Sequence, residues 1–208
     1  DEQGRLIYSK TNGSPYSLYS DGLKIYTTID SRMQGYAEEA VEKHLGGELQ
    51  EDFWNDIAKY NNPPFSNDLS SKEIKSIERA AMRRTERYRI MSGKECPNCH
   101  RRVKIEETTV DGVPHYHCMS EDCEEEWESV PKDSIENIFR TKKVPMSVFS
   151  WQGEIDTLMT PMDSILYYKS ILQAGLVSID PKTGFVKAWV GGNNYKHFQY
   201  DHVKQGKR

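Results

Sequence analysis

The first third of the chain changes from an alternating to a helical pattern of apolar positions. Residues 18–29 alternate Leu and Ile with Lys and Tyr after an Asp-Gly turn signal, which predicts a strand. Over residues 33–45 the apolar side chains recur three and four positions apart, which predicts one face of a helix. Ser31 with Gln34 forms a capping-box pair that predicts where this helix begins. The glycine pair at 46–47 predicts its end, or a kink before a helical segment over 48–60.

Two later helices have clear start signals. Ser70 with Glu73 predicts a helix that runs to about Met91. Thr160, followed by Pro161 and an acid at the third helical position, predicts another. Between them the pattern predicts a short helix near 133–140 and a strand at 144–151.

A hairpin is predicted near the end of the chain. The turn signal Asp-Pro-Lys-Thr-Gly at 180–184 lies between two apolar runs, so residues 176–190 are expected to form two strands. Lys182 then lies at the tip, in water. Alternation suggests that Val177 shares a face with Ala188 and Val190, while Trp189 points the other way.

Composition limits the kinds of partner. The 208 residues are 29% charged and 36% hydrophobic, with a net charge of −4, which predicts a modest core and a polar surface. This balance argues against a nucleic-acid-binding protein, because such proteins usually carry a basic face. No apolar run approaches the ~18 residues that span a bilayer, and the polar first residues are not a signal peptide. We therefore expect a piece of a longer protein.

All four cysteines fall in one segment, residues 92–131. Cys96-x2-Cys99 is followed after eighteen residues by Cys118-x4-Cys123, with a predicted hairpin and an Asp-Gly turn between the pairs. Two close pairs at this spacing are typical of a zinc ribbon, in which four thiolates complete a tetrahedral structural site. A module this small cannot bury enough apolar surface to fold without a structural metal ion or a covalent cross-link.

Two alternatives to zinc stay open at this stage, namely two disulfides or four free thiols. A zinc ion with four thiolate ligands already carries a net charge of −2, so nearby carboxylates weigh against it. Five of them flank Cys123 in the sequence: Glu121, Asp122, Glu124, Glu125 and Glu126. Arg101, Arg102 and Lys104 offset part of this charge. His100, His115 and His117 are able to replace a cysteine as ligands, but four cysteines already suffice and we expect these histidines at the surface.

Three stretches resemble class A penicillin-binding proteins, from the linker between their catalytic domains to just before the transpeptidase nucleophile. The stretch "DGLKIYTTIDSRMQGYAEEAVEKHL" resembles the segment that joins their two catalytic domains. The stretch from Val144 to Gly192, "VPMSVFSW…FVKAWVGG", resembles the entry into their transpeptidase domain in its Bacteroidetes form. The last residues, "NNYKHFQYDHVKQGKR", resemble the stretch that precedes the Ser-x-x-Lys motif. The resemblance implies an extracytoplasmic protein on the periplasmic face of the inner membrane, held there only by an N-terminal anchor outside this chain. In that compartment disulfides persist, which favours the alternative to zinc.

The resemblance also bears on two motifs that look catalytic. Serine penicillin-binding proteins use Ser-x-x-Lys, Ser-x-Asn and Lys-Thr-Gly motifs. The triplet at 182–184 is expected to be a turn, because a catalytic lysine of this kind must lie along a strand facing the nucleophile. Ser129-Val-Pro-Lys132 fits Ser-x-x-Lys only at chance frequency, and no Ser-x-Asn occurs in the chain. We therefore expect no catalytic residue here.

Together these patterns predict an α+β fold in three parts. A helical linker region spans 1–91, a small zinc-ribbon-like β insert spans 92–131, and 132–208 form an incomplete antiparallel sheet that opens a transpeptidase domain. The parent is expected to be a bifunctional peptidoglycan glycosyltransferase and D,D-transpeptidase, of which this chain is an inactive fragment. The alternative is a free-standing zinc-ribbon α+β module that binds another protein.

Three kinds of partner are expected. The first is the remainder of the parent chain, and the second is a regulator of cell-wall synthesis docked on the cysteine insert. The third is a second copy of this chain, because an incomplete sheet leaves an open edge that recruits strands.

Overall fold

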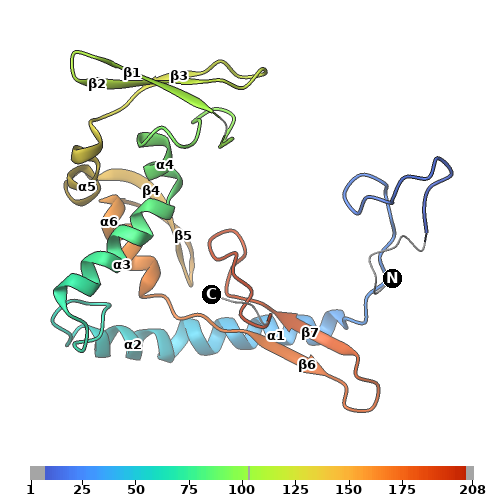
Figure 1. Cartoon of the computed structure of the whole chain (residues 1–208). Coiled ribbons are helices and arrows are strands. Elements are labelled where there is room, and N and C mark those ends of the chain that lie inside the picture. The colour runs from blue at the N-terminus through green and yellow to red at the C-terminus, as the bar shows by residue number, and fades with distance from the viewer. Residues whose placement is uncertain (1–7, 103, 205–208) are drawn as a thin grey trace.

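The computed structural model describes residues 8–102 and 104–204, and it confirms an α+β fold. None of the helices in these ranges is long and apolar enough to cross a membrane. Figure 1 shows α1 and α2 as one long helical arm, with α3 and α4 rising from its far end toward a small sheet. The helices are α1 (Ser31–His44), the π-helical η1 (Leu45–Leu49), α2 (Gln50–Ile57), α3 (Ser71–Arg84), α4 (Glu86–Met91), α5 (Lys132–Thr141) and α6 (Pro161–Lys169).

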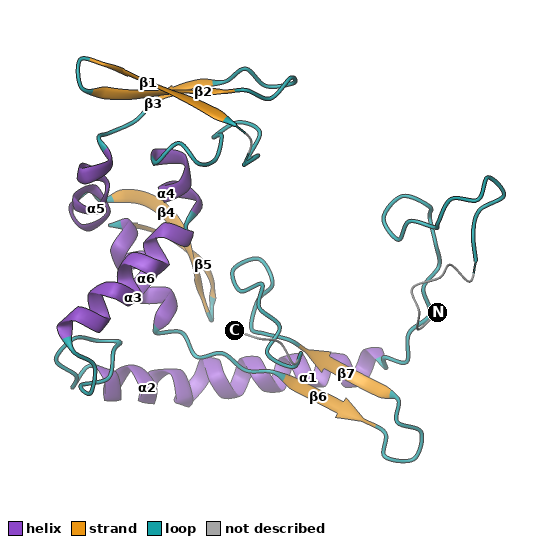
Figure 2. Cartoon of the chain, viewed as in Figure 1, coloured by secondary structure: helices purple, strands orange, loops and turns teal. Residues whose placement is uncertain are grey.

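The strands form three separate antiparallel sheets in the described residues. One sheet has the order β1-β2-β3, and the others are the hairpins β4-β5 and β6-β7. Figure 2 shows the three-stranded sheet at one end of the molecule and β6-β7 alongside α1. The strands are β1 (Ile105–Val110), β2 (Val113–Cys118), β3 (Glu126–Glu128), β4 (Val144–Ser150), β5 (Gly153–Met159), β6 (Leu176–Ile179) and β7 (Val186–Val190).

Side chains at the helix starts explain where the helices begin. Ser70 and Thr160 both form complete capping boxes, as predicted, and Pro161 occupies the first turn of α6. The start of α1 differs from the prediction, because Asp30 caps it instead of Ser31. One Asp30 carboxylate oxygen accepts hydrogen bonds from the backbone N–H groups of Arg32 and Met33, at 3.0 and 3.2 Å. A carboxylate there also interacts favourably with the helix dipole.

Two glycines shape the long helical arm. Gly47 leaves helical geometry, with φ −85° and ψ −122°, so α1 and α2 meet at a kink, as the glycine pair predicted. Gly46 lies against the ring of Trp151, and a Cβ at this position would come within 2.8 Å of it. The kink therefore coincides with a close contact between the arm and the β4-β5 turn.

The predicted helix from Ser70 to Met91 is broken at Thr85, which is a correction. Thr85 is extended, with φ −69° and ψ 144°. Its hydroxyl donates to the carbonyl of Met82 at 2.7 Å and accepts from the N–H of Tyr88 at 3.2 Å. The Thr85 side chain thus ends α3 and caps α4. Short polar side chains do this because their hydrogen bonds to nearby backbone groups compete with those of the helix.

The predicted strand over 18–29 is wrong, because these residues have no strand partner in the described chain. Leu23 and Ile25, whose alternation suggested it, are 41% and 66% exposed. Only its end meets a sheet: the Thr28 hydroxyl and the Asp30 N–H donate to carbonyls of β7 at 2.7 and 2.9 Å. An alternating pattern without a sheet to join does not form a strand.

The β6-β7 hairpin forms as predicted, but its faces differ from the prediction. Ser178 pairs with Ala188 and Val177 pairs with Trp189, so Val177 lies on the face of Trp189. A register shift between Ser178 and Ile179 accompanies this arrangement. Because paired residues project from the same face, the register and not the strand alternation alone decides which side chains are buried.

Helix α1 covers one face and part of the free edge of this hairpin. Ala37 and Val41 of α1 pack against Ala188 and Val190 of β7 in one hydrophobic cluster. The Gln34 side chain pairs with the backbone of Trp189, donating to its carbonyl at 3.0 Å and accepting from its N–H at 2.8 Å. The edge expected to be open is therefore partly satisfied from within the chain, while the face carrying Val177 and Trp189 stays exposed.

A second hydrophobic cluster joins α3, α5 and α6. Met82, Ile135, Phe139 and Met162 form it, and each is at most 3% exposed. The buried Gln50 of α2 donates to the carbonyl of Ser170 at 2.9 Å, and its side-chain oxygen accepts from the N–H of Leu172. The arm is thereby fixed to the chain that follows α6.

The β1-β2-β3 sheet docks on α4 through one face. Tyr116, 2% exposed, packs against Trp127 with ring centroids 5.5 Å apart. The indole N–H of Trp127 donates to the Ile90 carbonyl at 3.2 Å, and the Ser129 hydroxyl donates to the Met91 carbonyl at 2.7 Å. The sheet and the helix are therefore one packed unit.

Removal of the Phe139 ring tests the α3-α5-α6 cluster. Phe139→Ala should lower the free energy of unfolding by about 3–5 kcal/mol, because it leaves a cavity in a fully buried site. The matched control is Leu158→Ala on β5, where a 61% exposed side chain should change it by no more than about 0.5 kcal/mol. Urea unfolding measures both, and equal effects would contradict this packing.

Two glycines with positive φ test the docking of the sheet on α4. Gly93 has φ 67°, and a Cβ there would lie 2.3 Å from the Tyr116 ring; Gly112 has φ 81° and open space around it. Both alanine variants strain the backbone by about 1–2 kcal/mol. Gly93→Ala should cost at least about 1 kcal/mol more in urea unfolding, because it also overpacks Tyr116. Equal losses would show that Tyr116 does not pack there.

Candidate metal centre

Two short loops bring the four cysteines to one end of the β1-β2-β3 sheet. Cys96 and Cys99 lie in the loop after α4, where the His100 N–H donates to the Cys96 carbonyl at 3.0 Å. His100 adopts φ 54°, so the chain turns sharply just after the second cysteine. Cys118 ends β2, and the Cys123 N–H donates to the Ser120 carbonyl at 3.0 Å. Each loop is thus a tight turn that presents two sulfurs.

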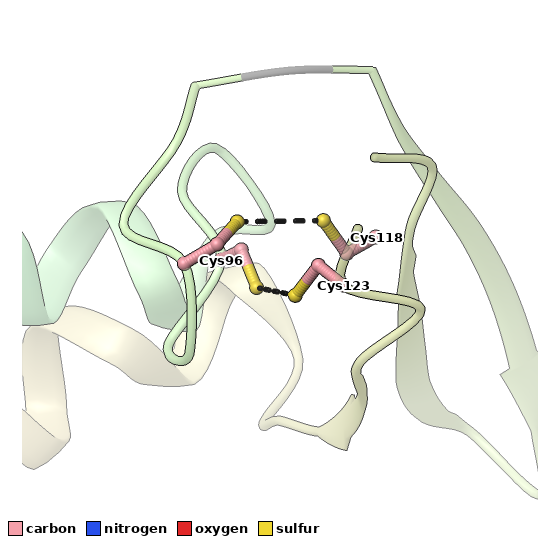
Figure 3. Close-up of side chains that lie close together, drawn as sticks. Cys96, Cys118 and Cys123 are labelled. Atoms are coloured by element: carbon pink, nitrogen blue, oxygen red, sulfur yellow. Dashed lines mark hydrogen bonds between the residues drawn. The ribbon is translucent and has the colours of Figure 1, made fainter. Parts of the chain in front are cut away.

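The four sulfurs converge on one point. All four Sγ atoms lie within 4.8 Å of one another. The Sγ atoms of Cys96 and Cys123 are 3.6 Å apart (Figure 3). Those of Cys99 and Cys118 are 3.8 Å apart. A tetrahedron with Zn–S bonds of about 2.3 Å has edges of about 3.8 Å. The geometry fits a four-thiolate metal site, and the predicted ligand set Cys96, Cys99, Cys118 and Cys123 is brought together.

The thiols differ in burial and in charge. Cys96 and Cys118 are fully buried, while Cys99 and Cys123 are partly exposed. Burial raises the pKa of the Cys118 thiol to about 12; the Ser120 N–H opposes this and the three neighbouring thiols add to it. Four close thiolates therefore need a cation to coexist, and none of the four cysteines is in a disulfide.

The surrounding charges are partly balanced. Arg101 donates to the Ser120 hydroxyl at 2.8 Å and lies 3.5 Å from Asp122. Arg102 and Arg89 both pair with the buried Glu95, at 3.2 and 2.6 Å. The Arg89 and Arg102 hydrogen bonds lower the pKa of Glu95, although desolvation opposes them. The carboxylate is therefore ionised, and the two guanidinium groups balance its charge.

The three histidines near the cysteines lie outside the sulfur cluster. His100 is exposed, and its Nδ1 is 2.7 Å from Glu86. His115 and His117 project from β2 on the face that carries Glu126 and Glu128, and each is partly exposed. No described histidine takes the place of a cysteine in the four-sulfur group.

The residues that mimic catalytic motifs have structural roles. The Ser129 hydroxyl donates to the Met91 carbonyl, and the Lys132 ammonium is 2.7 Å from Glu107. That hydrogen bond with Glu107 raises the pKa of Lys132, so the amine stays charged and is a poor base. Lys182 lies exposed in the hairpin turn, where its N–H donates to the Asp180 carboxylate at 2.9 Å and Gly184 has φ 72°.

Sequence reasoning missed two parts of this region. It did not predict β3, which has only three residues and pairs with β2 through His115, Tyr116 and His117. It also missed the contact of Tyr116 with Gly93, since a glycine that makes room for a distant ring leaves no local signal. The predicted hairpin with its Asp111-Gly112 turn is confirmed, both residues having positive φ, while Val103 lies outside the described residues.

Comparison with known proteins gives one finding. Residues 101–172 match the family model of the penicillin-binding protein middle domain. The match begins between the two cysteine pairs and extends beyond α6, so it includes the three-stranded sheet and the β4-β5 hairpin. No curated protein and no solved structure matches the chain. The family match supports a penicillin-binding protein family for this chain.

Proposed function

We propose that this chain is a non-catalytic, structural part of a class A penicillin-binding protein. Its parent polymerises glycan strands and cross-links stem peptides through a serine acyl-enzyme, on the periplasmic face of the inner membrane. The match of residues 101–172 to the penicillin-binding protein middle domain is the observation that carries the proposal. The helical arm and the docked sheet act as a scaffold, and the sheet at the end of the molecule offers a surface to a regulator.

The side-chain environments support the non-catalytic role. A serine nucleophile needs a base within hydrogen-bond reach and an oxyanion-binding site beside it. Ser129 instead donates to a helix-end carbonyl, and Lys132 pairs with Glu107. Lys182 is held at a turn by Asp180 and faces water. These groups hold the fold together and leave no activated hydroxyl among them.

Reaction with a penicillin tests this proposal. The 208 residues alone should keep their intact mass after incubation with a reactive penicillin, whereas the parent expressed from its whole gene should gain one adduct. An adduct on the 208-residue chain that disappears in Ser129→Ala would contradict the non-catalytic role. A parent that takes up no penicillin would contradict the family proposal.

We further propose that the four cysteines hold one structural zinc ion. The sulfur separations of 3.6 and 3.8 Å support this proposal, because they fit the edges of a four-thiolate site. Four protein ligands leave no open position for water, so the ion would hold the loops and not act on a substrate. Zinc would also stabilise the thiolate of Cys118, whose burial otherwise opposes ionisation.

Metal content and thiol state test the zinc proposal together. The purified chain should carry about one zinc, and four thiols should be free after the metal is removed under denaturing conditions. Cys99→Ser should lose most of the zinc, while the matched variant His100→Ala, one residue away, should keep it. A chain with neither zinc nor free thiols would contain disulfides and contradict the proposal. Zinc loss in His100→Ala would put a histidine in the site.

A further inference from the structure

One face of the β1-β2-β3 sheet carries an ordered array of imidazoles and carboxylates. The register places Glu106, His117 and Glu126 in one row across the three strands. It places Thr108, His115 and Glu128 in the next row. Paired residues and residues two apart on a strand project from the same face. We call this face, defined by these six residues, the histidine face.

The histidine face is open to solvent. Tyr116 and Trp127 project from the opposite face, which docks on α4. Figure 2 shows the sheet at the end of the molecule, with the helices to one side of it. The two imidazoles have side-chain exposures of 34% and 40%. A hollow of about 240 Å³ is lined by residues of all three strands, among them His115, His117, Glu106 and Glu126.

The two imidazoles are not committed to other groups. The Nδ1 atom of His115 is 3.9 Å from a carboxylate oxygen of Glu128, and that of His117 is 4.0 Å from Glu126. Both separations are too long for hydrogen bonds. The one cation close to the carboxylates of this face in the described chain is Lys104, 3.8 Å from Glu106 and 79% exposed. The face therefore combines two available imidazoles with uncompensated negative charge.

We propose that the histidine face is a second metal site, which binds a divalent transition-metal cation between His115 and His117 with Glu126 as a carboxylate ligand. Residues two apart on a strand are separated by about 6.8 Å, a spacing that the two imidazoles bridge by rotation of their side chains onto one cation. The ligand atoms of His115, His117 and Glu126 do not all lie within 4.8 Å of one another in the described structure, so binding requires this rotation. Glu126 pairs with His117 on the neighbouring strand and brings a carboxylate to the same place. The cysteine cluster at one end of β2 holds the strand that carries both histidines.

The donor set separates this site from the cysteine cluster. Four thiolates favour zinc, whereas imidazole and carboxylate donors with open positions accept zinc, nickel or copper. The site also differs in exposure, since Cys118 is fully buried whereas His115 and His117 are partly exposed. Its cation would thus be exchangeable, while that of the cysteine cluster would be structural.

Nickel binding to the zinc-saturated chain tests the proposal. Titration calorimetry with Ni²⁺ should show one site, and His115→Ala or His117→Ala should each weaken binding about tenfold or more, since even outer-shell changes cost about 10–100-fold. The matched control is His44→Ala, an exposed histidine on α1, which should leave binding unchanged. Zinc content measured on the same samples shows whether the cysteine cluster is intact. Absent binding, or equal binding in the double histidine variant, would overturn the proposal.

A second pair of variants tests the carboxylate. Glu126→Gln should weaken nickel binding several-fold, because it removes a charged oxygen ligand from the row of His117. Glu121→Gln changes an exposed carboxylate of the same acidic stretch outside the histidine face and should have no effect. Equal affinities for the two variants would show that the acidic stretch attracts the cation without coordinating it, and would overturn the assignment of Glu126.

Discussion

The convergence of four cysteine sulfurs is the constraint on which the β1-β2-β3 sheet depends. This sheet has almost no interior of its own: Tyr116 is its one fully buried ring among the described residues, and Trp127 covers it from one side. Three short strands with so little apolar burial are marginal in water. The two loops that carry the cysteines close one end of the sheet, and the contacts of Trp127 and Ser129 with α4 hold one of its faces against that helix.

The rest of the chain is organised by helices that supply what the small sheets lack. Helix α1 covers β7 with Ala37 and Val41, and Gln34 satisfies backbone groups at its edge. The α3-α5-α6 cluster around Phe139 supports the helices on which the cysteine-bearing sheet rests. Gln50 joins the helical arm to the chain that follows α6 through hydrogen bonds. The β6-β7 hairpin is thus stabilised by the helix next to it and not by further strands.

The sequence was most informative where the cause of a structure is local. The capping boxes at Ser70 and Thr160 and the kink at Gly47 depend on neighbouring residues, and each was predicted. The failures involve partners distant in the chain. Residues 18–29 alternate like a strand but find no sheet. Strand β5 is an exception, because its partner β4 is adjacent in the chain; it was overlooked because most of its residues are exposed and no buried apolar pattern marks it. The histidine face likewise exists only through the register of three strands.

Hydrogen exchange before and after treatment with a chelator, which removes the zinc ion proposed for the cysteine cluster, tests the dependence of the sheet on that cluster most directly. The account predicts that amides of β1, β2 and β3 lose protection when the metal is removed, because the sulfurs then repel one another or separate. Amides of α1 and β7, which are held by their own hydrophobic cluster, should keep theirs. Unchanged protection of the three-stranded sheet after complete removal of zinc would contradict the account.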